Sequence, residues 1–283
     1  MSKDKMLENV KKLREITGVG FKDCKLALDE NNGDIEKSID YLRKKGIAKA
    51  SKKMSRTAAD GLVLVCEKDN EMSALEINSE TDFVAKNKDF INFCKEVSEI
   101  NFKNKGSLEK TKSYLMKNNK SVDENLINLI TKIGEKITIR RSKFFDKSGI
   151  NFSYVHNSLE KNVGKVVSII KINGGKQQDL KDIGSKLAMH VAASAPIAIE
   201  KNGIEKSILD KEIEIIKEEL KNSGKKEEMI DKISQGKLNK FISDNTLLNQ
   251  IWIMDPKKKV KDILKTDITV IDFVRFKVGE GVD

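Results

Sequence analysis

The chain has little of what marks several large classes of protein. Its 283 residues contain no apolar run that approaches the roughly 20 residues needed to cross a bilayer. Its N-terminal segment has neither the apolar stretch of a signal peptide nor the acid-free, Arg-rich composition of a transit peptide. We therefore expect a soluble, cytoplasmic protein that makes no contact with a membrane.

Cysteine and histidine are also scarce. The three cysteines, Cys24, Cys66 and Cys94, are far apart and form no CxxC pair, so the sequence supports neither a disulfide framework nor a zinc site. The two histidines, His156 and His190, do not combine with other residues into a Ser/His/Asp or Cys/His constellation. Phosphate-binding patterns such as GxGxxG and GxxxxGK[ST] are missing. The sequence thus indicates a protein that is not an enzyme and needs neither a metal nor a cofactor.

Aromatic residues make up only 5% of the chain, whereas its net charge is +10. Such a charge suits nucleic acid, but the lysines are dispersed among Glu and Asp and do not alternate with stacking rings. We therefore expect no direct nucleic-acid contact, and a charge that steers encounter with an acidic protein partner. The alternative is a basic RNA- or ribosome-associated protein, which steeply salt-dependent RNA binding would favour.

The N-terminal part of the chain, residues 1–46, reads as three short helices between Lys5 and Lys45, with Thr17-Gly18-Val19-Gly20 as the first break. Asn32-Gly33 ends the second helix, and Asp34 is well placed to cap the third. So small a unit has a thin core and should depend on a neighbour or partner for stability. Residues 47–56 read as a basic linker.

The middle of the chain alternates strand and helix patterns typical of an α+β fold. In residues 57–142, Leu62–Cys66 and Ser73–Ile77 predict a β-hairpin, and a helix is expected from about Phe83. Further helices are expected over Leu108–Met116 and Asn125–Gly134, then a strand over Lys136–Arg141. A similar order follows, with strands over Phe152–His156 and Lys165–Ile172 and a helix over Asp179–Ala193. We interpret this as two related α+β subdomains, the second formed by residues 143–203 and 243–283.

An insertion of different character, residues 204–242, lies within the second subdomain. Leu209, Ile213, Ile216 and Leu220 follow the spacing of a coiled-coil seam. Asn222-Ser223-Gly224-Lys225 interrupts it, and a second apolar face continues through Met229, Ile230, Ile233, Leu238 and Phe241. This pattern predicts an antiparallel helical hairpin, too short to dimerise the protein alone. A short helix over Lys257–Leu264 and a strand over Ile268–Lys277 complete the chain.

The segment Thr81-Asp82-Phe83-Val84-Ala85-Lys86-Asn87 places an acid and an aromatic ring where a helix begins, directly after the strand-like run Met72–Ser79. Thr81 or Asp82 is a plausible N-cap. From spacing alone, Asp82 would cap the helix and Phe83 would belong to the core.

The same segment resembles the signature of the bacterial elongation factor Ts family, the nucleotide-exchange factors of elongation factor Tu. Other blocks resemble the family in the same order along the chain: Leu13-Arg14-Glu15, Thr17-Gly18-Val19-Gly20, Asp23-Cys24-Lys25, Gly33-Asp34, Ala58-Ala59-Asp60-Gly61, Ile133-Gly134-Glu135-Lys136-Ile137, Arg140-Arg141, Met189-His190-Val191-Ala192-Ala193-Ser194 and Val278-Gly279-Glu280-Gly281. The resemblance implies that the three N-terminal helices form a ubiquitin-associated-like module that grips the partner.

It also implies a site. The loop Thr81–Val84 would reach into the guanine-nucleotide domain of elongation factor Tu, in its GDP-bound and nucleotide-free forms, and dislodge Mg²⁺ so that GDP leaves and GTP binds. His190 would press on the partner beside its phosphate loop, and Val163 and Gly164 would make further contacts.

The sequence departs from the family at 157–162, where a glycine-rich connection is usual, and at Asn249-Gln250-Ile251-Trp252, where a Pro-Phe pair is common after the Gln. We also expect no contacts from the extra C-terminal helix that some members carry.

Overall fold

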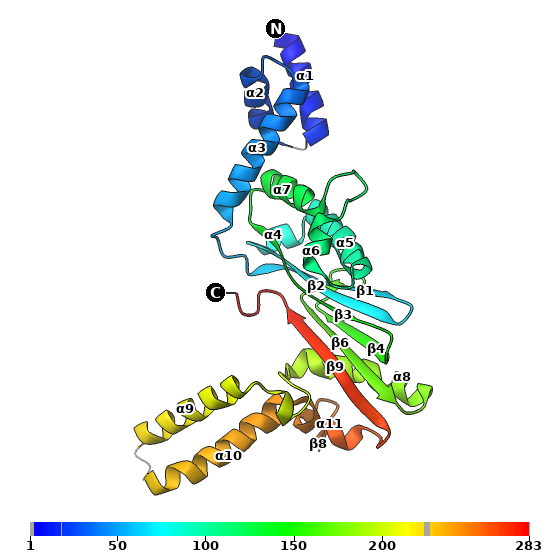
Figure 1. Cartoon of the computed structure of the whole chain (residues 1–283), viewed down its shortest axis with the longest axis vertical. Helices are drawn as coiled ribbons and strands as arrows, with labels where there is room; N and C mark the ends of the chain where they lie inside the picture. The colour runs from blue at the N-terminus through cyan, green and yellow to red at the C-terminus, as the bar shows by residue number, and fades with distance from the viewer. Residues whose placement is uncertain (1–2, 18, 224–226, 283) are drawn as a thin grey trace.

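The computed structural model describes residues 3–17, 19–223 and 227–282. The molecule is elongated, with the N-terminal helices at one end, two β-sheets with their covering helices in the middle and a helical hairpin at the other end (Figure 1). This arrangement confirms the expected α+β class, the three-helix module and the inserted hairpin. Within the described ranges, no helix is long and apolar enough to cross a membrane.

The N-terminal module consists of α1 (Lys3–Thr17), α2 (Phe21–Glu30) and α3 (Ile35–Lys53). Asp34 caps α3 as expected, because its side chain accepts a hydrogen bond from the Lys37 backbone N–H. The first break falls between α1 and α2, and its Gly18 lies outside the described residues. The module has a small apolar core of its own, formed by Val10, Leu13, Val19, Cys24, Ala27, Leu28 and Leu42.

Helix α3 runs through most of the segment expected to be a linker, since it ends only at Lys53. It continues because it packs against α7 (Val122–Ile133) of the central body. Gly46 makes this approach close: a Cβ there would lie 2.9 Å from the Thr131 hydroxyl oxygen. Arg43 also forms an ion pair with Glu124 at the start of α7. The N-terminal module therefore packs against the central body and is not tethered to it by a flexible linker.

The first sheet has the strand order β3-β2-β1-β5. Its strands are β1 (Asp60–Lys68), β2 (Glu71–Ser79), β3 (Ile137–Phe145) and β5 (Val163–Gly164). Strands β1 and β2 form the expected hairpin, and Asp69 and Asn70 of its turn have φ of 51° and 65°. Two consecutive left-handed residues are typical of a type I′ turn, which matches the twist of the flanking strands.

The second sheet has the order β4-β6-β9, all antiparallel, with β4 (Ile150–His156), β6 (Val166–Gly174) and β9 (Ile268–Lys277). Helix α8 (Gln177–Ser194) covers its outer face. On the outer face of the first sheet lie α4 (Asp82–Ala85), α5 (Lys88–Lys103), α6 (Leu108–Ser113) and α7.

Three apolar layers hold the two sheets and their helices together. Along β1, Leu62 and Leu64 face the helices, whereas Val63 and Val65 face the second sheet. This alternation follows the period of two in a strand, and it explains why a strand buried on both faces is apolar throughout. The third layer joins the second sheet to α8.

Two expected helices are shorter in the structure. Helix α6 ends at Ser113 because Tyr114 turns to an extended conformation. Residues expected at the start of the Lys257–Leu264 helix instead form β8 (Asp255–Lys259), which pairs with β7 (Ile251–Trp252), so α11 covers only Val260–Ile263.

The inserted hairpin consists of α9 (Lys206–Asn222) and α10 (Glu227–Asn245), which contact each other along their length. Its core includes Ile216, Leu220, Ile230, Leu238 and Ile242. Gly224 and Lys225 of the expected bend lie outside the described residues. The exact division into residues 1–46, 47–56, 57–142, 143–203 with 243–283, and 204–242 stays a prediction.

A buried carboxylate joins β2, β3 and the C-terminal turn. Glu76 has 0% of its surface exposed and lies on the face of β2 that also carries Met72 and Ala74. A β-bulge in the pairing of β2 with β3 leaves Arg140 without a partner residue on β2, beside Arg141. Because a bulge redirects side chains, both guanidinium groups can reach Glu76 from one strand.

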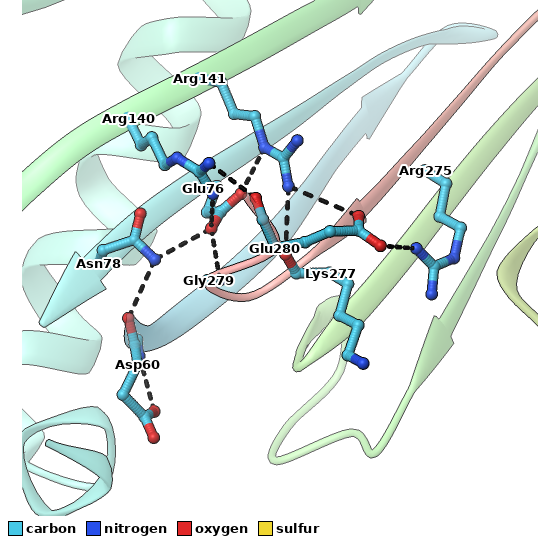
Figure 2. Close-up of polar contacts among 10 residues, drawn as sticks. Asp60, Glu76, Asn78, Arg140, Arg141, Arg275, Lys277, Gly279 and Glu280 are labelled. Carbon is cyan, nitrogen blue, oxygen red and sulfur yellow. Dashed lines mark hydrogen bonds and ion pairs between the residues drawn. The ribbon is translucent and has the colours of Figure 1, made fainter. Parts of the chain in front are cut away.

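The contacts of Glu76 satisfy both of its oxygens (Figure 2). Oε1 accepts from Arg140 Nη1 at 3.0 Å and from the Gly279 backbone N–H at 2.9 Å, and Oε2 accepts from Arg141 Nε at 2.5 Å. Gly279 has a φ of 72°, and a Cβ there would lie 1.9 Å from the Ala59 carbonyl oxygen. The turn therefore needs glycine both for its conformation and for its approach to the sheet.

We predict that Glu76→Gln lowers the free energy of unfolding by about 3 kcal/mol at pH 7, because removing one partner of a buried ion pair leaves the other uncompensated. Hydrogen bonds and the arginines outweigh burial and hold the pKa of Glu76 below its ordinary value of 4.5. Its stabilising effect is thus complete above that value and is lost as the pH falls through the lower, folded-state pKa. Urea unfolding between pH 7 and pH 3 measures both effects.

The control is Asp272→Asn, whose carboxylate is 44% exposed and pairs with Lys143 outside the Glu76 network. This variant should lose less than about 1 kcal/mol. Equal losses in the two variants would show that the buried carboxylate has no special weight.

Candidate functional site

The Thr81–Val84 loop lies where β2 leaves the first sheet. Strand β2 ends at Ser79, Thr81 occupies the N-cap position, and the single-turn helix α4 covers Asp82–Ala85. The longer helix expected from about Phe83 is interrupted because the Asn87 side chain accepts from the Asp89 and Phe90 backbone N–H groups, which begins a new helix, α5. The loop is therefore a short projection between two regular elements.

Within α4 the apolar side chains point in opposite directions. Val84 and Ala85 are buried in the core beneath the first sheet's helices. Phe83 is 80% exposed, more than any other large apolar side chain among the described residues. The placement of Phe83 in the core, which spacing alone favoured, is therefore wrong, and the ring stands out from a base that the core holds.

Asp82 does not act as the N-cap but as the first residue of α4. Its carboxylate accepts a hydrogen bond of 2.7 Å from Lys86 Nζ, one turn later, and both side chains are about half exposed. The bond to Lys86 holds the pKa of Asp82 below its ordinary value. Asp82 is thus ionised at neutral pH and stands beside the exposed ring with a partner that solvent can replace.

Two glutamates for which the sequence predicted no role lie at the start of this loop, and one of them contacts it. Glu135 accepts hydrogen bonds from the Thr81 backbone N–H at 3.0 Å and from the Thr81 hydroxyl at 2.7 Å. Glu80 accepts from the Lys136 backbone N–H at 2.6 Å. The only signal in the sequence was the position of Glu135 within a block that resembles the family, because 54 residues separate it from Thr81.

Val163 and Gly164 lie close to the loop but beneath the surface. They form β5, which pairs with Val63 and Leu64 of β1. Val163 is 2% exposed, and a Cβ on Gly164 would lie 2.8 Å from the His156 carbonyl oxygen. The divergent segment before them forms a tight loop, in which the Leu159 N–H donates to the Val163 carbonyl oxygen. This pair therefore shapes the surface from below.

His190 is a buried residue in the free chain, and the expectation that it presses on a partner stays a prediction. Its ring is 0% exposed and stacks on Trp252 with 5.2 Å between ring centroids. Gln250 Oε1 lies 3.0 Å from Nε2, while the Gln250 amide donates to the carbonyl oxygens of Ser194 and Asp244. The amide oxygen therefore accepts, Nε2 carries the proton, and Nδ1 has no partner.

Burial lowers the pKa of His190 below its ordinary value of 6.5, against the opposing effect of the hydrogen bond that Nε2 donates to Gln250 Oε1. A second proton on Nδ1 would be a buried charge without an acceptor. The residue consequently fixes the segment after the hairpin onto α8 rather than presenting a titrating group at the surface.

No group of three or more His, Cys, Asp or Glu side chains that could hold a metal ion occurs in the described ranges. Cys24, Cys66 and Cys94 are free thiols, and burial raises the pKa of the Cys94 thiol well above its ordinary value. The Thr81–Val84 loop does not combine a nucleophile with a base and a group that orients the base, as covalent catalysis would need. What it offers to a partner is apolar surface and a carboxylate.

We predict that His190→Ala lowers the free energy of unfolding by about 2–4 kcal/mol at pH 7.5, because it leaves a cavity beside Trp252 and removes the donor to Gln250 Oε1. In the unmodified protein, the folded chain protonates this residue only at a lower pH than the unfolded chain, so stability falls as the pH drops below 6.5. His190→Ala removes this contribution to the slope. His156→Ala, at an exposed ring, is the control for both measurements; identical stability and slope in the two variants would contradict the assignment.

The chain is similar to known proteins over nearly its whole length. Residues 80–280 match the family model described as elongation factor TS. The chain is 36% identical over 286 residues to elongation factor Ts of Maricaulis maris, covering 97% of this chain and 92% of that protein. It is 41% identical over 276 residues to elongation factor Ts of a Psychrobacter species, covering 97% and 91%. The chain therefore belongs to the elongation factor Ts family, cytoplasmic factors of protein synthesis that act as nucleotide-exchange factors for elongation factor Tu and are not enzymes.

Proposed function

We propose that the loop Thr81–Val84 is the part of this exchange factor that enters the guanine-nucleotide domain of elongation factor Tu and loosens its hold on Mg²⁺ and GDP. The observation that carries the proposal is the 80% exposure of the Phe83 ring on a base held by buried residues. A large apolar side chain kept in water by a well-packed body indicates a surface that is covered in a complex.

The physical basis is differential binding. A GTPase holds GDP through a phosphate-binding loop and through Mg²⁺, which bridges phosphate and protein oxygens. A phenyl ring that moves from water into a gap between elements of the partner gains roughly 1.5–3 kcal/mol. If the gap exists only when these elements are displaced from the nucleotide, this energy favours the state with weakened Mg²⁺ and GDP binding.

Asp82 would act beside the ring. Its carboxylate is ionised, half exposed and bonded only to Lys86 in a surface ion pair, which contributes little and exchanges readily with other donors. In the complex it would accept hydrogen bonds from partner groups freed by the displacement. We propose that the factor engages elongation factor Tu in both its GDP-bound and its nucleotide-free forms, without direct contact to nucleic acid or membrane.

For the residues beneath the surface we propose indirect roles. Val163 and Gly164 set the height of the surface next to the loop through their pairing with β1. A direct contact of His190 with the partner would require its ring to leave the apolar layer between the second sheet and α8, where it stacks on Trp252.

We predict that Phe83→Ala slows factor-stimulated GDP release about 10- to 100-fold, the equivalent of the apolar burial that the ring would lose. Its folding should be unaffected, since the ring makes little contact within the chain. Stopped-flow release of a fluorescent GDP from elongation factor Tu measures the rate, and circular dichroism checks the fold. Tyr114→Ala, at another exposed ring outside the N-terminal module, is the matched control; an unchanged rate in Phe83→Ala would refute the role given to the loop.

We predict that Asp82→Ala slows the same release about tenfold, the weight of one hydrogen bond to a charged group. Asp82→Asn should be intermediate, because the amide keeps an acceptor oxygen but loses the charge. Lys86→Ala separates the partner role from the internal ion pair, since it frees the carboxylate without removing it. If Lys86→Ala is as slow as Asp82→Ala, the ion pair and not a partner contact explains the effect.

A further inference from the structure

We propose that Glu135 and Glu80 are positioning residues that hold the Thr81–Val84 loop in the orientation required for exchange. The inference rests on the function proposed for this loop and adds to it the device that orients the ring. It concerns two acidic side chains from different segments of the chain, called here the Glu80/Glu135 pair.

The pair lies at the point where backbone hydrogen bonding between β2 and β3 stops. The last paired residues of this ladder are Ser79 and Ile137. The chain then leaves the sheet, so the backbone groups just beyond these residues need other partners. Side chains take over there: Glu135 accepts from the Thr81 backbone N–H, and Glu80 accepts from the Lys136 backbone N–H.

The two hydrogen bonds run in opposite directions between the two segments. Each segment supplies one carboxylate and one backbone N–H to the other, so the two bonds fix the segments as a unit rather than one end alone. Hydrogen bonds with an ionised acceptor are the stronger kind. Arg56 adds a bond of 3.3 Å to Glu80 from the segment that follows α3.

Thr81 gives up its usual task for this contact. It occupies the N-cap position of α4, yet its side chain makes no capping bond to the helix. Its hydroxyl donates instead to Glu135 at 2.7 Å. A helix of four residues has no stability of its own in water. The orientation of α4 is therefore set by its contacts with the rest of the chain. Its own Val84 and Ala85 pack into the core on one side, and Glu135 binds Thr81 on the other.

Glu135 is itself held firmly. It directly follows Gly134, which ends α7 with a φ of 91° and whose N–H donates to the Ile130 carbonyl oxygen. Lys53 Nζ donates to the Gly134 carbonyl oxygen. Since α7 also packs against α3, the position of the N-terminal module and that of the loop share one rigid element.

The consequence concerns Phe83, two residues beyond Thr81. Without the pair, the ring would remain exposed but would sample several directions, and the partner would have to select one of them. Ordering a loop on binding costs free energy that is then missing from the displaced state. The pair should therefore affect the rate at saturation more than the fold.

We predict that Glu135→Ala lowers the maximal rate of GDP release at saturating factor about tenfold, the equivalent of about 1.4 kcal/mol. The measurement titrates the factor against elongation factor Tu loaded with a fluorescent GDP, so that the plateau rate and the half-saturating concentration are separated. Thr81→Val, which lacks the hydroxyl, should lower the plateau in the same direction, and Thr81→Ser should retain it. In the double variant, Thr81→Val should add little to Glu135→Ala.

The matched control is Asp146→Ala in the turn between β3 and β4. Asp146 accepts from the Ser148 backbone N–H at 2.9 Å and the Ser148 hydroxyl at 2.5 Å, the same kinds of donor that Thr81 supplies to Glu135. Its removal should cost comparable thermal stability while leaving the plateau rate unchanged. An equal fall of the plateau in Asp146→Ala would overturn the inference, because general loosening would then explain both.

The outcomes also separate this inference from the function on which it rests. If Phe83→Ala lowers the plateau and Glu135→Ala does not, the positioning role is wrong and the loop remains the exchange element. If Phe83→Ala leaves the plateau unchanged, the proposed function of the loop is wrong, whatever Glu135→Ala does.

Discussion

The buried carboxylate of Glu76 is the constraint on which the central body depends. An ion pair with no exposure on the carboxylate side is stable only when every acceptor site is used, and here two arginines, an amide and a backbone N–H use them. The network joins the middle of β2 to β3 and to the last turn of the chain (Figure 2). Strand β2 is thus fixed by its neighbours, by two apolar faces and by a charge. The Thr81–Val84 loop therefore begins at a rigidly held strand end.

Beyond the end of β2, the structure keeps a phenyl ring in water and holds it in one direction, which is unusual for a large apolar side chain on a protein surface. The core holds the neighbouring residues Val84 and Ala85, and side-chain bonds replace the backbone ladder beyond Ser79. The same separation explains why burial at Val163, Gly164 and His190 is compatible with a functional surface. These residues support the body, and the exposed part is confined to a few side chains.

The sequence predicted elements whose signals are local and missed those that depend on distant partners. The hairpin of β1 and β2, the cap at Asp34 and the seam of α9 are all encoded by residues that lie close together in the chain. The extension of α3 depends on Gly46 meeting Thr131, 85 positions later, and the burial of His190 depends on Gln250 and Trp252. Spacing alone placed Phe83 in the core, because an apolar residue in the first turn of a helix usually lies there. Only the resemblance of the surrounding motif to the family signature predicted that the Phe83 ring is exposed.

Preorganisation connects this architecture to exchange. If the factor lowers the affinity of its partner for GDP and Mg²⁺ by some ratio, these ligands must lower the affinity for the factor by the same ratio. Any free energy used to order the loop during binding would weaken the complex without contributing to the displacement of the ligands. In the function proposed for the loop, order already present in the free factor avoids this loss, so that burial of Phe83 would act on the geometry of the partner. In the proposed function, such a factor needs few contacts at the nucleotide site, and it leaves when GTP and Mg²⁺ return, because these ligands lower the affinity of the partner for the factor.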